Sequence, residues 1–102
     1  MTWLGRSKSL RYLGALHGRG TLQVRADGTD LGPVAYEIDG YAEGAKRSAN
    51  GRIEAETEIL TRAFQAGPLS IALAGGSVIE IELSDPCGGR VADIRVIGRF
   101  PL

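Results

Sequence analysis

The side chains best suited to bind a ligand in this sequence are four basic or amide residues near the N-terminus. They are Arg11, His17, Gln23 and Arg25. A hairpin turn through Gly18–Gly20 would bring all four to one face of a sheet. Guanidinium groups hold phosphate or carboxylate through charge-assisted, bidentate hydrogen bonds. The pattern therefore predicts a basic hairpin face that binds an anionic ligand, with a merely solvated face as the alternative.

A second basic pair, Lys46 and Arg47, lies in the segment GYAEGAKRSANG at 40–51. Its small and polar residues predict a long, mobile loop, and loops of this kind often carry function. We expect both side chains to contact the same anionic ligand.

The sequence lacks the residues or the spacing that a structural zinc site, a P-loop, a dinucleotide-binding motif or a catalytic cysteine requires. One cysteine and one histidine cannot supply the four ligands of a structural zinc site. The segment GAKRS at 44–48 lacks the order of a P-loop, and HGRGTLQ lacks the third glycine of a dinucleotide fingerprint. Cys87, in SDPCGGR, has no flanking lysine to activate it, which indicates a turn thiol. The sequence thus predicts no catalytic residue, no cofactor and no metal.

The composition is that of an ordinary small protein, and its formal net charge is zero. At 102 residues the chain is long enough for one domain, predicted over 1–102. Twelve basic and twelve acidic residues cancel, unlike the basic balance of a dedicated nucleic-acid binder. A single cysteine favours a reducing, cytoplasmic location, and no apolar run approaches the ~20 residues that span a bilayer. We therefore expect no membrane partner.

Strict alternation of apolar and polar residues predicts strands along much of the chain. In VADIRVIGRF the residues Ala92, Ile94, Val96 and Phe100 share one face. Before it, a hairpin turning through Gly75–Ser77 would set Leu73 opposite Ile79. Tyr12 and Leu16 are expected on the core side of the N-terminal hairpin.

One segment has helical spacing instead. The apolar residues of EILTRAFQAGP recur at three- and four-residue intervals, and Gly67-Pro68 ends the pattern as a helix stop signal. We predict a short helix near 58–66.

These elements predict a mainly β fold. Six to seven short strands with glycine turns form a small antiparallel β-barrel or a β-sandwich meander, with an OB-like barrel as the specific alternative. The leading functional hypothesis is a non-catalytic binding or assembly domain. The alternatives are a single-stranded nucleic-acid-binding OB-like module and a small hydrolase or isomerase with a pocket in the barrel. Open sheet edges also predict a homodimer as one way to cover them.

Overall fold

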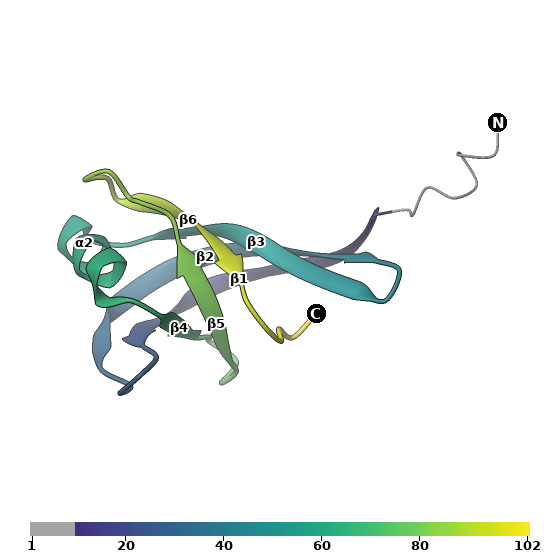
Figure 1. The fold of residues 1–102 in the computed structure, drawn as a ribbon, viewed down its shortest axis with the longest axis horizontal. Helices are drawn as coiled ribbons and strands as arrows, with labels where there is room; N and C mark the ends of the chain where they lie inside the picture. Colours follow the sequence, from purple (N-terminus) through teal and green to yellow (C-terminus); the bar gives the residue numbers. More distant parts are fainter. Residues whose placement is uncertain (1–9) are drawn as a thin grey trace.

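A computed structural model describes residues 10–102 and shows a closed barrel with one helix against its end (Figure 1). The elements, in chain order, are β1 (Leu10–Val24), β2 (Asp30–Glu43), β3 (Lys46–Glu54), α2 (Thr57–Ala66), β4 (Leu69–Ala72), β5 (Val78–Leu83) and β6 (Val91–Val96). The mainly β prediction and the helix predicted near 58–66 are both confirmed.

The six strands form two meanders that close on each other. Their order around the barrel is β1-β2-β3-β6-β5-β4. Both seams, β3 with β6 and β1 with β4, are antiparallel. Helix α2 carries the chain from β3 to β4. The architecture is thus a barrel and not a sandwich, and it has six strands where an OB barrel has five.

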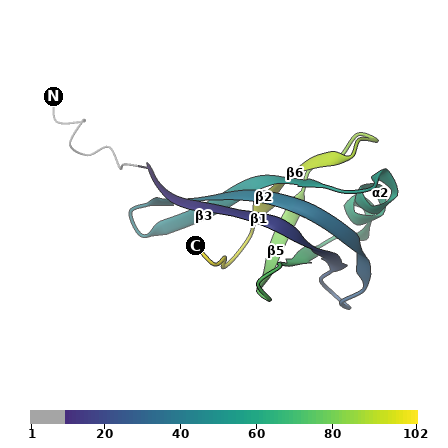
Figure 2. The same cartoon turned by 180° about the vertical axis from the view of Figure 1, so that it is seen from behind.

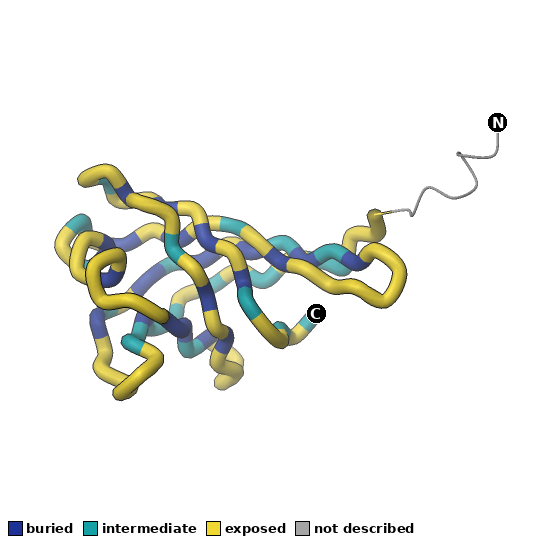
Figure 3. Tube along the Cα trace, viewed as in Figure 1, coloured by how far each residue is buried: buried dark blue, intermediate teal, exposed yellow. Residues whose placement is uncertain are grey.

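Buried residues occur along every strand, at alternate positions in most of them (Figure 3), and their side chains fill the barrel interior. The largest of them, less than 2% exposed, are Leu22, Val34, Ile38, Ile53, Leu69, Ile71, Ile79 and Ile81, together with Leu60 of the helix. Leu60 and Ala63 lie one turn apart on α2, so this helix closes one end of the core with a single apolar stripe. The inward alternation predicted for β5 and β6 is confirmed.

The predicted N-terminal hairpin is wrong, because β1 runs straight through Gly18–Gly20. Gly18 pairs with Tyr36 and Gly20 with Val34, both in β2. A Cβ at Gly20 would lie 2.2 Å from the carbonyl oxygen of Ala72. This glycine therefore serves the close approach of β4 and makes no turn.

The predicted long loop at 40–51 is also wrong. The segment is part of a tight hairpin in which Glu43 pairs with Lys46, so only Gly44 and Ala45 make the turn. Gly44 has φ +62°, a conformation that glycine adopts without strain.

The β4–β5 hairpin has the predicted loop length but a different register. Ile71, and not Leu73, lies opposite Ile79. The Leu73 N–H donates to the Ser77 carbonyl at 2.7 Å, which leaves a loop of Ala74–Gly76. Because the register differs by two residues, each side chain still faces the side that alternation predicted.

The first three strands are longer than the last three and extend beyond the barrel as an arm (Figure 2). The arm comprises residues 10–18, 36–43 and 46–49. Strand β4 pairs only with Thr21–Val24 of β1, and β6 only with Asn50–Glu54 of β3. The arm is therefore a three-stranded ribbon with two faces, of which the inner face continues into the barrel interior.

Candidate functional site

A bulge in β1 decides which side chains of the arm share a face. The register shifts between Tyr12 and Gly14, so Leu13 has no partner in β2. Tyr12 pairs with Tyr41, the two rings lie 5.6 Å apart, and its hydroxyl donates to Asp39 Oδ1 at 2.9 Å. These residues lie on the outer face, and Tyr12 is 55% exposed, which corrects its predicted place in the core.

Because neighbours along a strand face opposite ways, Arg11 lies on the inner face. It pairs with Ala42, and Ala42 pairs with Arg47 on its other side. Directly paired residues share a face, so the two arginines flank Ala42 in one row across the arm. Adjacent strands are ~4.8 Å apart, which places their Cα atoms about 10 Å from each other. Both side chains are exposed and long enough to meet over Ala42.

The C-terminal segment lies against the same face and holds one of the two arginines. The Arg47 guanidinium carbon is 5.1 Å from the centre of the Phe100 ring, a cation–π contact. Phe100 and Leu102 lie over Gly40, where a Cβ would be 2.7 Å from Leu102 Cδ1 and 3.1 Å from Phe100 Cε2. Glycine at this position therefore leaves the space that the segment occupies.

Charge is separated between the two faces of the arm. The acidic residues of its strands, Glu37, Asp39 and Glu43, alternate with inward residues of β2 and lie on the outer face. In the described part of the arm, the inward positions carry no acid, and Arg11 and Arg47 are their charged residues. An anion approaching the inner face therefore meets two positive groups and no Asp or Glu side chain from the described strands of the arm.

The structure brings together two of the six residues predicted as a binding site, Arg11 and Arg47. His17 and Gln23 face outward, and Gln23 Nε2 donates to Asp30 Oδ1 at 2.9 Å. Lys46 lies beside the arm's turn, paired with Glu43 on the outer face.

Arg25 lies at the opposite end of β1, 2.8 Å from Glu80 Oε1. The single basic face predicted for Arg11, His17, Gln23 and Arg25 is thus not formed, because β1 does not turn and its bulge reverses Arg11. Whether any of these side chains binds a ligand stays a prediction.

Phe100 was missed as a member of the site. Phe100 packs partly buried against the core, on the side predicted by its alternation with Ile94 and Val96, although β6 itself ends at Val96. No local pattern indicates that the chain beyond β6 returns to the arm and meets Arg47.

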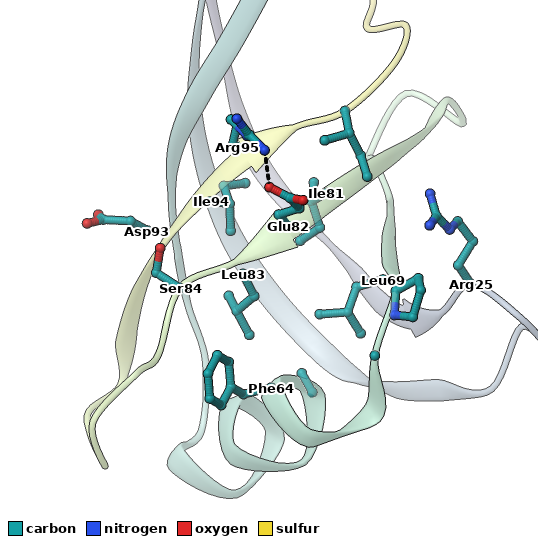
Figure 4. A pocket seen from close by; sticks show the side chains of 14 residues that line it. Arg25, Phe64, Leu69, Ile81, Glu82, Leu83, Ser84, Asp93, Ile94 and Arg95 are labelled. Atoms are coloured by element: carbon teal, nitrogen blue, oxygen red, sulfur yellow. Dashed lines mark hydrogen bonds and ion pairs between the residues drawn. The ribbon is translucent and has the colours of Figure 1, made fainter.

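A concave region, separate from the arm, lies between α2 and the β5–β6 hairpin (Figure 4). This open hollow has a volume of about 590 Å³. Its apolar lining includes Phe64, Leu69, Ile81, Leu83 and Ile94. The arginines at its rim are both neutralised, Arg25 by Glu80 and Arg95 by Glu82. The hollow therefore offers shape and apolar surface but no unpaired positive charge.

The remaining chemistry-bearing residues form no cluster. Within residues 10–102, no three His, Cys, Asp or Glu side chains are grouped closely enough to hold a metal ion. Cys87 lies exposed in the β5–β6 turn, as predicted, and its N–H donates to Asp85 Oδ1 at 2.8 Å.

No helix in the described part of the chain is long and apolar enough to cross a membrane. No family model, curated protein or solved structure matches this chain, so the arm and its two arginines are interpreted from their own geometry.

Proposed function

We propose that this protein is a non-catalytic binding domain that holds an anionic ligand between Arg11 and Arg47 on the inner face of the arm. One observation carries the proposal: the two arginines lie in the same cross-strand row, on a face without acids. The ion pairs of residues 10–102 involve Arg25, Arg52 and Arg95 and leave these two guanidinium groups free.

The geometry suits a ligand with one compact or two adjacent anionic groups. Each guanidinium presents a planar set of donors that matches a phosphoryl or carboxylate group. The contact with Phe100 restricts Arg47 before the ligand arrives, so less side-chain entropy is lost on binding. Phe100 and Leu102 cover Gly40, and Leu102 also lies over Gly14, so the ligand would lie beside this segment, between the two exposed guanidinium groups.

The nucleic-acid alternative has less support. OB barrels bind oligonucleotides mainly across the face of their second and third strands. The outer face of β2 carries Glu37, Asp39 and Glu43, which repel phosphates.

The hydrolase or isomerase alternative also has less support. It requires acidic side chains inside the barrel, and the one buried polar or charged side chain among the described residues is that of Ser70.

The same proposal places the protein in the cytoplasm. Cys87 is a free, exposed thiol, and such thiols persist in a reducing compartment.

Charge reversal tests the function with pyrophosphate as the probe. Charge-assisted hydrogen bonds contribute about 1.5–3 kcal/mol each, so Arg11→Glu with Arg47→Glu should weaken binding about a hundredfold or more. Isothermal titration calorimetry at low salt measures the affinity. The control is Arg62→Glu, which makes the same Arg-to-Glu change once, on an exposed residue of α2 at the other end of the molecule, and is compared with each single variant, Arg11→Glu and Arg47→Glu, as well as with the double variant.

The wild-type protein and the control should bind alike, and their affinity should fall as salt is added. An unchanged affinity in the double variant, or equal losses in the double variant and the control, would reject the site.

A further inference from the structure

The hollow between α2 and the β5–β6 hairpin lies where the pairing of β4 with β5 stops. The last residues paired there are Leu69 and Ile81. Two positions further along β5, the residue in register with Leu83 is Gly67, which has φ +94° at the C-terminal end of α2 and belongs to no strand. Strand β5 therefore continues beyond the end of its partner and forms one side of the hollow.

The backbone N–H and C=O groups of Leu83 both point into this gap. On the other side of β5, the Ser84 N–H donates to the Asp93 carbonyl at 2.9 Å. The Ile97 N–H donates to the Glu80 carbonyl, also at 2.9 Å. Even-numbered residues of β5 thus point toward β6, and since backbone groups alternate along a strand, odd-numbered residues point the opposite way. In the described part of the chain, no backbone group bonds to Leu83 from the side of the hollow.

The side chains around this unpaired donor and acceptor are apolar. Those of Leu83, Phe64 and Leu69 converge on the hollow from β5, α2 and β4 (Figure 4). Phe64 is still 46% exposed, so its ring has surface left to contact a ligand. The volume of about 590 Å³ lies within the range of small-molecule sites, which combine apolar walls with a few placed polar groups.

The charged groups at the rim leave the hollow without a free ionic partner. Arg25 is 2.8 Å from Glu80 Oε1, and Arg95 pairs with Glu82. The Asp93 carboxylate points away from the hollow (Figure 4). An uncharged ligand therefore complements this site better than an ion does.

We propose that the hollow binds an uncharged small molecule of the N-acylated amino-acid amide class that carries a large apolar side chain. The ligand N–H donates to the Leu83 carbonyl and the ligand carbonyl accepts from the Leu83 N–H, as in a hydrogen-bonded antiparallel pair. Residues directly opposite in such a pair share a face, so the ligand side chain points as Leu83 does, toward Phe64 and the core. The ligand thus takes the position opposite Leu83 that β4 leaves empty. This site uses neither Arg11 nor Arg47 and is independent of the proposed anion site.

The probe is N-acetyl-L-phenylalaninamide, titrated to millimolar concentration into the labelled protein and followed by NMR. The expected result is saturable shifts of the Leu83 amide and of the Phe64 ring. In the free protein the Leu83 amide should exchange quickly with solvent, whereas the Glu82 and Ser84 amides, which point toward β6, should be protected. Bound probe should slow Leu83 exchange several-fold.

Two changes separate this binding mode from unspecific apolar contact. In the ester analogue of the probe, oxygen replaces the N–H that donates to Leu83, and binding should weaken about tenfold. Phe64→Ala removes the aromatic wall and should also weaken binding about tenfold. The control is Val78→Ala, which truncates another exposed apolar side chain, on β5 but outside the hollow, and should bind as the wild type does. The variant with Arg11→Glu and Arg47→Glu should keep its affinity for the probe.

Any of four results would overturn the proposal. They are slow Leu83 exchange in the free protein, no saturable shifts at Leu83 with millimolar probe, equal affinity for the ester analogue, and equal affinity of the Phe64→Ala and Val78→Ala variants.

Discussion

The hydroxyl of Tyr12 donates a hydrogen bond to the carboxylate of Asp39, with 2.9 Å between the two oxygens. This bond fixes Tyr12 on the outer face of the arm. Because β1 is bulged just beyond Tyr12, the neighbouring Arg11 faces the opposite way and joins Arg47. The proposed anion site thus lies on the face of the sheet opposite this contact.

The pKa of the Tyr12 phenol should lie above its ordinary value of 10.0, because the hydrogen bond to Asp39 and its negative charge both favour the protonated form. The folded-state pKa is raised, so the stability from this bond is present below pH 10.0 and is lost as the pH rises through the raised pKa. Tyr12→Phe should therefore lower the denaturation midpoint at neutral pH. The difference from the wild type should shrink above pH 10.0, and a difference independent of pH would contradict this account.

Gly51→Ala should be strongly destabilising. A Cβ there would lie 1.9 Å from the Glu37 carbonyl oxygen and 2.8 Å from the Ile38 Cα, and these backbone atoms cannot move without breaking the β2–β3 pairing. Overpacking of this kind costs about 1–3 kcal/mol or more. Gly75→Ala is the control, since nothing lies within 4 Å of its Cβ. Equal urea midpoints for the two variants would show that β2 and β3 do not approach each other at Gly51 as closely as described.

Amide hydrogen exchange should alternate along the arm portion of β1. Leu16 and Gly18 bond to β2 and should be protected, whereas Ala15, His17 and Arg19 point away from β2 and should exchange fast. Two-dimensional NMR in deuterated buffer measures each amide. Uniform protection from 15 to 19 in the isolated protein would mean that this side of β1 is already covered.

Leu60→Ala should cost more stability than Phe64→Ala, although both side chains belong to α2. Leu60 is fully buried against the barrel, and its truncation should cost about 2–5 kcal/mol. Phe64 is 46% exposed at the hollow beside the β5–β6 hairpin, so its truncation removes less apolar contact. Chemical denaturation of both variants measures the difference, and the reverse order would contradict the docking of this helix.

Alternation of apolar and polar residues predicted the strands that bury one face in the barrel, as in β5 and β6. Ile79 and Ile81 of β5, and Ala92 and Ile94 of β6, point inward because apolar residues at every second position can bury only one face of a strand. The helix over Thr57–Ala66 was predictable for the matching reason, since Leu60 and Ala63 have helical spacing.

The glycines account for the main errors. A glycine permits a turn, but it also permits close approach of another chain segment, and local sequence does not separate these uses. Gly44 makes a turn, whereas Gly20 and Gly51 lie against the backbone of neighbouring strands.

One pattern did indicate a continuous β1. Its small and apolar residues, Gly14, Leu16, Gly18, Gly20 and Leu22, occupy every second position without interruption.

The candidate site was only partly predictable. The sequence predicted Arg11 from a hairpin register and Arg47 from a polar loop, and the structure has neither the hairpin nor the loop. The common face of the two arginines depends on the bulge at Leu13 and on the tight turn at Gly44-Ala45, and neither has a clear local signal. The contact of Arg47 with Phe100 joins residues 53 positions apart and follows from the closure of the barrel.

An NMR titration of the labelled protein with pyrophosphate tests the anion site most directly. The site predicts saturable shifts of the Arg11 and Arg47 side-chain signals, with accompanying shifts at Ala42 and the Phe100 ring, and no change at Arg62. Absence of saturable shifts, or shifts confined to residues outside the inner face of the arm, would contradict it.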